Sequence, residues 1–336
     1  MNNAKGRTMI TGCGGLVGSH VLRYFLENTD HEMVCIDSWE HKGQPTNTLK
    51  AIMGFEDRCT VITHDLNAHF TDRQKKQIGH IDYILNIASE SHVDRSIEDP
   101  VNFVKNNVNL VLNMLEFARE VKPKLFLQFS TDESKGVAPK GVLHEEWAPT
   151  NPSNPYAASK AAQEDIAISY WRTYTLPVVI TQTMNIYSEI QDWEKFIPLC
   201  VKRILKGEEI TIHAYVGATE AGSRFYIHAD SVAEAILFII QKKPVQYPES
   251  ERLDRYNIVG DKEVDNLTLA KTISEILGKP LKYKLTDAHS ARPGHDVRYG
   301  LDGTKLANLG WKPTKNFDSK LKEIVLKLKD RYENDN

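Results

Sequence analysis

A glycine-rich segment near the N-terminus limits most strictly how this chain can fold. The apolar run over residues 7–11 is typical of a short strand, and an amphipathic helix is predicted over about residues 16–27. Gly12 and Gly15 lie between the predicted strand and helix, and Gly18 lies within the predicted helix. In this spacing the first glycine allows a tight turn, the second lets an anionic ligand approach the backbone, and the third lets helix and strand pack closely. Strand, glycine loop and helix in this order predict the opening unit of a parallel α/β sheet.

A second apolar run, residues 33–37, ends in Asp37, about 20 positions after Gly18, where dinucleotide-binding folds place a ribose-binding acid. A carboxylate there accepts the ribose hydroxyls and repels a 2′-phosphate, which favours NAD over NADP. The alternative is that Asp37 only opens a turn. Because strand, loop, helix, strand and acid follow in order, we expect NAD as the cofactor, with its pyrophosphate at the N-terminus of the first helix.

Strands and helices continue to alternate along the chain. Further strands are predicted over residues 59–65, 81–88, 124–131 and 177–187, and helices over residues 101–121 and 155–174. This alternation predicts an α/β fold of the Rossmann type, a doubly wound parallel sheet. We expect residues 1–187 to form this domain, with 225–260 returning to it, and residues 188–224 and 261–336 to form a smaller C-terminal substrate-binding lobe.

The predicted lobe carries basic residues that suit an anionic ligand. Lys195, Arg224, Arg292 and His295 could converge on a diphosphate, although surface charge is the alternative for each taken singly. In the same region we predict a turn-rich loop over residues 211–222, a helix over 231–241, a helix starting near residue 267 and capped by Asn266, and a terminal helix over 317–332.

Two adjacent acids follow the fifth predicted strand. This strand delivers Ser130, Thr131, Asp132 and Glu133 to its carboxyl end, where ligands bind in open α/β sheets. Two carboxylates beside a hydroxyl suggest acid and base chemistry. Alone, the four residues are more simply interpreted as the cap of a turn. The cofactor signals elsewhere in the chain reverse that preference.

Tyr156 and Lys160 lie four residues apart in a helix that begins at Pro155, so they share one face, and Asn154 or Ser153 is a plausible cap. A nearby ammonium lowers a tyrosine pKa from about 10 toward neutrality, which would make Tyr156 a usable base. The alternative is a core tyrosine beside a lysine that reaches solvent. Because a dinucleotide-binding motif precedes these residues in the chain, we favour the catalytic interpretation.

Composition excludes several other classes. A net charge of −3 gives no reason to expect nucleic acid, and no apolar run approaches the roughly 20 residues of a membrane helix. The histidines show no ligand spacing, so we expect no metal. Cys13, Cys35, Cys59 and Cys200 are expected to be buried thiols in a reducing compartment. Because the N-terminus leads directly into a strand, we expect no signal peptide and a cytoplasmic protein.

Together these residues resemble an extended short-chain dehydrogenase/reductase, and most of all the dTDP-glucose 4,6-dehydratase group. The resemblance spans residues 11–311. It is carried by segments 11–20, 89–97, 130–133, 194–198 and 292–299, and by Tyr156 with Lys160. The triplet Thr131-Asp132-Glu133 discriminates this group, because sugar 4-epimerases usually lack both acids and related decarboxylases usually lack the Asp.

The resemblance implies conversion of a nucleotide-diphosphate hexose to its 4-keto-6-deoxy form. Tyr156 would take the C4 hydroxyl proton while hydride passes to NAD, Lys160 would hold the ribose, and Thr131 would bond the C4 oxygen. Glu133 would remove the C5 proton, and a protonated Asp132 would give its proton to the departing C6 hydroxyl. Hydride would then return to C6, so NAD should remain tightly bound.

The resemblance also implies two sets of binding residues and a partner. The cofactor would be held by Gly12, Gly15, Leu16, Val17, Gly18, Asp37, Ser38, Asp65, Leu66, Ala88, Ser89, Asn106, Tyr156 and Lys160. The nucleotide sugar would be held by Ser91, Thr131, Asn185, Lys195, Phe196, Thr211, His213, Arg224, Asn266, Arg292 and His295. The helices over 101–121 and 155–174 would form a four-helix interface in a homodimer.

The sequence departs from the group at several positions. Ser134 and Lys135 stand where Val and Tyr are usual, Asn86 where His is common, Gln182 where Arg is common, and Ile186 where a second Asn is common. None is in the catalytic set. They leave the base and the hexose open, dTDP- or UDP-glucose being favoured. The rival functions are a nucleotide-sugar 4-epimerase or decarboxylase, or a non-catalytic NAD sensor.

Overall fold

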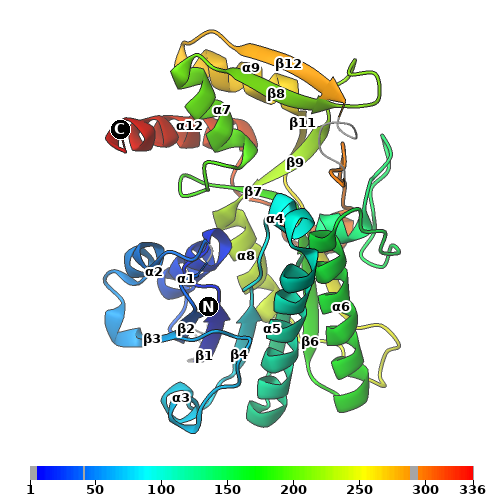
Figure 1. Cartoon of the computed structure of the whole chain (residues 1–336). Coiled ribbons are helices and arrows are strands. Elements are labelled where there is room, and N and C mark those ends of the chain that lie inside the picture. The colour runs from blue at the N-terminus through cyan, green and yellow to red at the C-terminus, as the bar shows by residue number, and fades with distance from the viewer. Residues whose placement is uncertain (1–5, 41, 288–293, 336) are drawn as a thin grey trace.

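The computed structural model describes residues 6–40, 42–287 and 294–335. Its centre is a seven-stranded sheet in which every adjacent pair of strands is parallel (Figure 1). The strand order is β10 (Asp254–Ile258), β6 (Val178–Thr183), β5 (Leu125–Thr131), β4 (Tyr83–Asn86), β1 (Arg7–Thr11), β2 (Glu32–Asp37) and β3 (Cys59–Thr63). The order reverses beside β1, between β4 and β2, as in a doubly wound sheet. The predicted fold class is confirmed.

Helices cover both faces of this sheet (Figure 1). One apolar core joins the sheet to α1 (Leu16–Asn28), α2 (Pro45–Ile52), α8 (Ala229–Ile240) and α11 (Thr304–Asn308). A second core on the opposite face involves α3 (Asp72–Ile78), α5 (Pro100–Val121) and α6 (Pro155–Tyr174), with the short α4 (Val93–Glu98) at the end of α5. Alternate residues of a strand serve the two cores, as Met9 and Ile10 of β1 do, because successive side chains point to opposite faces.

A smaller lobe sits on the carboxyl edge of the sheet (Figure 1). It holds a three-stranded sheet of β11 (Lys262–Asp265), β9 (Ser223–His228) and β7 (Asn185–Tyr187), and a two-stranded sheet of β12 (Lys282–Asp287) and β8 (Glu209–Ala214). Its own core is closed by α7 (Phe196–Lys206), α9 (Asn266–Leu277) and α12 (Phe317–Asn334). Residues 229–258, which form α8 and β10, return to the large sheet.

The predicted strand over residues 177–187 is wrong as a single element. β6 ends at Thr183 in the large sheet, and β7 begins at Asn185 in the small one, where it pairs with β9. The chain therefore leaves one sheet for the other at Met184, which lines the cleft between them. Nothing in the local sequence of residues 177–187 signalled this change of sheet.

The predicted loop over residues 211–222 is wrong in its first part. Residues 209–214 form β8, in which Ile210, Ile212 and Ala214 are buried and the intervening side chains are partly exposed. This two-residue alternation is typical of a strand with one covered face. A turn follows, in which the Tyr215 amide donates to Glu220 O at 2.9 Å.

Helix caps explain where several elements begin. Asn154 accepts from the Ala157 amide at 2.8 Å, with Pro155 as the first residue of α6, as predicted. For α9 the predicted cap is wrong, because Asp265 rather than Asn266 accepts from the Thr268 amide, at 2.8 Å.

The described residues contain neither a candidate membrane span nor a cluster of metal ligands. None of their helices combines the length and the apolarity that crossing a bilayer demands. Nor do three His, Cys, Asp or Glu side chains of these residues gather as a metal site requires. The four cysteines are free thiols, and all but Cys59, which is partly exposed, are buried.

Candidate active site

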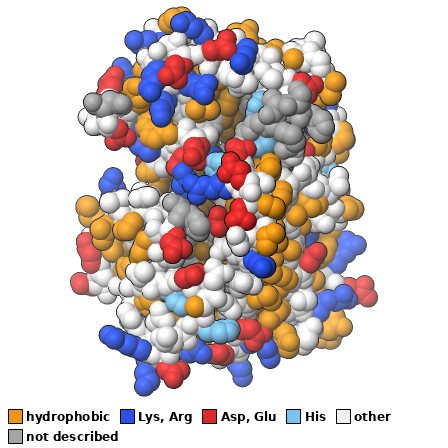
Figure 2. All heavy atoms as spheres, in the orientation of Figure 1, with side chains coloured by type: hydrophobic (Ala, Val, Ile, Leu, Met, Phe, Trp, Pro, Cys, Tyr) orange, Lys and Arg blue, Asp and Glu red, His pale blue; other side chains and the backbone are white. Residues whose placement is uncertain are grey.

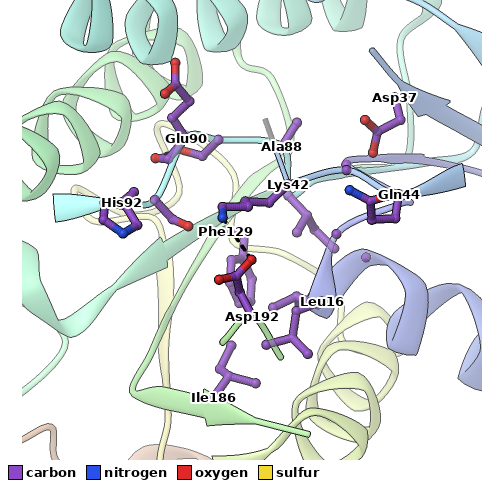
Figure 3. A pocket seen from close by; sticks show the side chains of 18 of the residues that line it. Leu16, Asp37, Lys42, Gln44, Ala88, Glu90, His92, Phe129, Ile186 and Asp192 are labelled. Carbon is purple, nitrogen blue, oxygen red and sulfur yellow. Dashed lines mark hydrogen bonds and ion pairs between the residues drawn. The ribbon is translucent and has the colours of Figure 1, made fainter. Parts of the chain in front are cut away.

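A cleft of about 800 Å³ lies where the two parts of the molecule meet. Its floor is the carboxyl edge of the large sheet, from the glycine loop and Asp37 to Ala88 and Phe129, and Ile186 and Asp192 close it from the smaller lobe (Figure 3). Figure 2 shows acidic and basic side chains gathered at this junction. Every residue predicted to bind the cofactor lines the cleft.

The glycine loop forms a cradle with room for an anion. The Gly12 amide donates to Ile36 O at 2.8 Å, and its φ of +72° is a conformation that suits glycine. At Gly18 an added Cβ would lie 2.0 Å from Gly12 O, so only glycine lets α1 pack there. No side chain of the described residues caps α1 at Gly15, which leaves its first amides to bind a ligand. These features fit the pyrophosphate of a dinucleotide.

Asp37 lies at the end of β2 beside this loop (Figure 3). Its carboxylate accepts from the Gly14 amide at 2.8 Å and from the Trp39 amide at 3.0 Å, so the backbone fixes its orientation. A carboxylate oxygen has more than one lone pair, and ribose hydroxyls could therefore still donate to it. Asp65 and Leu66 follow β3 on the same side of the cleft. The set fits NAD.

The predicted acid pair lies at the cleft floor, where Asp132 is buried and Glu133 is partly buried. Asp132 and Glu133 follow β5 in a short 3₁₀ turn, residues 132–135, which Thr131 caps. Burial, followed by the charge of Glu133, raises the pKa of Asp132 to about 7. Burial also raises the pKa of Glu133, while the charges of Lys195 and Arg224 oppose the rise. A carboxyl with a pKa near 7 can carry a proton at neutral pH, as a general acid must.

Tyr156 and Lys160 share a face of α6, as predicted, but the expected effect of the lysine is wrong. Burial, followed by the charge of Glu133, raises the pKa of Tyr156, and a hydrogen bond with Thr131 only partly opposes the rise. Lys160 does not act on the phenol because its Nζ donates to Phe129 O at 2.6 Å and to Gln163 Oε1 at 2.7 Å. Burial lowers the pKa of Lys160 itself to about 7.

The predicted substrate residues divide into two groups. Ser91, Asn185 and Lys195 line the cleft, together with Thr131. Phe196 begins α7, and Thr211 and His213 lie on β8, which places them outside the lining of this cleft. Asn266 at the start of α9 is also outside it and lies 3.3 Å from the Tyr226 hydroxyl. Arg292 lies outside the described residues.

The predicted convergence of basic residues on an anion is not the arrangement found among the described residues. Arg224 donates to the carbonyl oxygens of Ser223, Val297 and Asp296 and stacks on the Tyr299 ring at 4.7 Å. Its charge opposes the rise in the pKa of both Asp132 and Glu133. His295 Nε2 instead lies 3.0 Å from Asp94 Oδ1 of α4.

The sequence did not reveal two further features of the site. Lys42 Nζ crosses the cleft to Asp192 Oδ2 at 2.9 Å and lies 3.4 Å from Glu194 Oε2, while His92 Nε2 is 2.8 Å from the same Glu194 oxygen (Figure 3). The Tyr299 hydroxyl donates to Glu133 Oε2 at 3.4 Å. No local pattern joins residues so far apart, although Tyr299 stood within a segment that carried the resemblance.

The fold and the cleft define a Rossmann-type protein of the extended short-chain dehydrogenase/reductase class. Its sequence matches the profile of the GDP-mannose 4,6 dehydratase family over residues 9–324. The chain belongs to this family of nucleotide-sugar dehydratases and epimerases.

Individual relatives agree with this placement. A probable dTDP-glucose 4,6-dehydratase of Sinorhizobium fredii is 32% identical over 334 residues, covering 95% of this chain and 91% of that protein. The dTDP-glucose 4,6-dehydratase of Haemophilus influenzae is 32% identical over 343 residues, covering 94% and 96%. These identities show the family without fixing the substrate.

Solved structures point to the same class. DesIV, a dTDP-glucose 4,6-dehydratase of Streptomyces venezuelae solved with NAD bound, superposes with a TM-score of 0.82 at 30% identity, covering 98% of this chain and 97% of that one. The UDP-glucose 4-epimerase of Thermus thermophilus, in complex with NAD, gives 0.84 at 26% identity, covering 96% and 98%. Fold similarity therefore does not separate dehydration from epimerisation.

Proposed function

We propose that this protein is an NAD-dependent nucleotide-sugar 4,6-dehydratase that converts a nucleotide-diphosphate hexose, most simply dTDP- or UDP-glucose, to the 4-keto-6-deoxy sugar and water. The observation that carries the proposal is the acid pair of the buried Asp132 and the partly buried Glu133, which lies beside Tyr156 in a cleft with a dinucleotide cradle. Oxidation and reduction at C4 alone do not require a second acid and base, whereas elimination of water does.

Residues of the cleft divide the first step between them. When bound, NAD supplies the hydride acceptor and a positive charge that opposes the rise in the Tyr156 pKa. Tyr156 takes the proton of the C4 hydroxyl, and Thr131, which is hydrogen-bonded to Tyr156, orients the C4 oxygen. The N-terminus of α1 and Asp37 would hold the cofactor, and Lys160, which lines the same cleft, would bind its ribose hydroxyls.

The acid pair performs the elimination. The C4 ketone acidifies the C5 proton, which Glu133 removes, while Asp132 donates a proton to the C6 oxygen as it leaves as water. The two carboxyls must hold opposite protonation states, and their environments differ in the required direction. Asp132 has the charge of Glu133 beside it. Arg224 favours the ionised form of both acids, and Lys195 favours that of Glu133. Glu133 is thus the better base and Asp132 the better acid.

A homodimer through α5 and α6 is part of the proposal. α5 carries an outward stripe that includes Val101, 60% exposed, and the partly buried Val104, Val108 and Leu112. Figure 2 shows hydrophobic side chains along this helix. Pairing with the same face of a second copy would cover them. Light scattering should give twice the chain mass, and Val108→Glu should give the monomer; a monomeric wild type would contradict this part.

A panel of nucleotide hexoses tests the function. Each is incubated with the NAD-loaded protein, and the product is weighed by mass spectrometry. Loss of one water from one member of the panel supports dehydration. An unchanged mass with an altered sugar would show a 4-epimerase, the rival that the Thermus thermophilus likeness favours, and loss of carbon dioxide from a nucleotide uronic acid would show a decarboxylase. Binding of NAD without turnover across the panel would leave a non-catalytic sensor.

A further inference from the structure

A second buried carboxylate, Glu164, lies directly behind the acid pair. It is on the face of α6 that carries Tyr156 and Lys160, one turn further along the helix, and it is fully buried. An ionised carboxylate in such a position is costly unless hydrogen bonds and an opposite charge surround it. The proposed reaction assigns no step to Glu164.

Its two oxygens share Gln182 Nε2, which lies 3.3 Å from Oε2, and otherwise have different partners. Oε1 accepts from Ser130 Oγ at 2.5 Å, from Ser134 Oγ at 3.0 Å and from Gln182 Nε2 at 3.0 Å. Oε2 lies 3.3 Å from Arg255 NH2. Arg255 comes from β10, the strand beside β6, and stacks on the Trp147 ring at 4.3 Å. Gln182 stands where the family resemblance suggests an arginine, and the cation reaches Glu164 from the neighbouring strand instead.

The two serines bound to Oε1 bracket the catalytic triplet. Ser130 precedes Thr131, and Ser134 follows Glu133. Ser134 Oγ also lies 3.0 Å from Thr131 O, which closes the turn on itself. A single rigid helix therefore holds the turn at both ends through one carboxylate oxygen.

The orientation of Asp132 depends on this turn. Its Oδ1 accepts from Thr131 Oγ1 at 3.1 Å, a bond within the turn, and its buried Oδ2 has no hydrogen-bond partner among the described residues. Nothing outside the turn that the structure describes holds the carboxyl in place. A small rotation of the turn would redirect both acids relative to the sugar, while Tyr156, on the helix, would stay where it is.

We propose that Glu164 is a positioning residue for the elimination step: through Ser130 and Ser134 it fixes the turn that aims Asp132 and Glu133, while Arg255 pairs with its other oxygen. It acts on the acid pair more than on C4 oxidation, because Tyr156 and Lys160 are set by α6, and Thr131, the last residue of β5, is held by its pairing with Thr183 in the sheet.

The kinetic test rests on the proposed function. Glu164→Gln holoenzyme is mixed with the hexose that the panel identifies, and the near-ultraviolet absorbance of reduced nicotinamide is followed in a single turnover. Bound NAD should be reduced within about threefold of the wild-type rate, whereas release of dehydrated product should fall about 100-fold, because a misplaced acid loses its alignment with the reacting atoms. Reduced cofactor therefore accumulates. Equal slowing of both steps, or an unchanged elimination rate, would overturn the inference.

A second readout does not depend on turnover. Amide hydrogen exchange, followed by mass spectrometry, should accelerate in peptides covering residues 130–136 in Glu164→Gln and in Ser130→Ala, while peptides covering 161–174 stay protected. Unaltered exchange in residues 130–136 would overturn the inference even if the wild type dehydrates no hexose. Conversely, faster exchange in residues 130–136 of the variants, together with a wild type that dehydrates no hexose, would support the role of Glu164 in positioning the turn but would rule out the proposed dehydratase function.

Asp82→Asn is the matched control. Asp82 is another buried carboxylate of the same sheet, but it lies at the opposite edge, where it accepts from the Arg7 amide at 2.9 Å and from Lys124 Nζ at 2.8 Å. Its loss should reduce stability without separating the two steps of the reaction. If Asp82→Asn also slowed elimination alone, the effect of Glu164→Gln would be one of general stability and the inference would fail.

Discussion

The cofactor half and the sugar half of the cleft are built in different ways. The cofactor half consists largely of backbone, namely the glycine loop, the first turn of α1 and the ends of β2 and β4. The sugar half consists of side chains from separate segments, among them Ser91 after β4, Asn185 on β7 and Lys195 before α7. The cofactor half therefore rests on short local motifs, although its residues run from Gly12 to Lys160, and the sugar half depends on how distant segments meet.

This difference explains why relatives with different reactions share one fold. The dehydratase DesIV and the Thermus thermophilus epimerase superpose on this chain almost equally well, with TM-scores of 0.82 and 0.84. A backbone cradle tolerates changes in the side chains around it, so the reaction can change through a few residues of the sugar half. We expect substitutions in the two halves to separate cofactor binding from chemistry.

The largest effect is expected from the acid pair. Asp132→Asn with Glu133→Gln keeps the size of both side chains but removes the proton donor and the base, so release of dehydrated product should fall about 1000-fold. Reduction of bound NAD should persist, because Tyr156 is unchanged. Single-turnover absorbance and mass spectrometry measure the two steps separately. Full product formation by the double variant would remove both residues from the mechanism.

Gly18→Ala should disable the cofactor half alone. The added methyl group would lie 2.0 Å from Gly12 O, which must displace the loop from α1, and NAD affinity should fall about 100-fold, or about 2.7 kcal/mol. Calorimetric titration with NAD measures the change. Gly54→Ala is the control, because at a φ of +82° it also strains the backbone but lies outside the lining of the cleft. Equal NAD affinity in Gly18→Ala and the wild type would show that the loop is not the cradle.

The pH dependence of elimination should reflect the protonation of the acid pair, Asp132 and Glu133, in the sugar half of the cleft. The donor form of Asp132 is the protonated one, and its pKa is raised to about 7, so the rate should fall about tenfold per pH unit above that value. At low pH the rate should fall again as Glu133, whose pKa is also raised, takes up a proton. Single-turnover rates across this range provide the measurement. A flat profile on the alkaline side would contradict the assignment of Asp132 as the acid.

The two halves also differ in how far the sequence could predict them. The glycine loop, Asp37 and the ends of the strands follow from local patterns, and the predicted cofactor residues all line one cleft. The change of sheet at Met184 and the ties of Arg224 to Val297 O and Asp296 O depend on packing between distant segments, which periodicity does not report. The pKa of Tyr156 could not be predicted for the same reason. Spacing along α6 predicts that Lys160 lies one helical turn from Tyr156. It does not predict that the Lys160 Nζ donates to Phe129 O.

The smallest effect is expected at the bridge that joins the two halves. Lys42 follows β2 on the cofactor side, and its ion pairs with Asp192 and Glu194 reach the smaller lobe across the cleft (Figure 3). Because these groups are partly exposed, each pair contributes at most about 1 kcal/mol. Lys42→Ala should therefore release NAD about three to five times faster, an effect that high salt should reproduce in the wild type.

Fluorescence of bound nucleotide, followed after dilution into excess competitor, measures this release. Lys140→Ala is the matched control, since it removes an exposed ion pair with Glu220 that does not cross the cleft. If both variants release NAD at the wild-type rate, the bridge does not retain the cofactor, and the two halves are held together by their packing alone. If Lys42→Ala alone releases it faster, retention of NAD depends on the smaller lobe as well as on the glycine cradle. The cofactor half would then be built from local motifs, while its retention of NAD would depend on a distant segment of the chain.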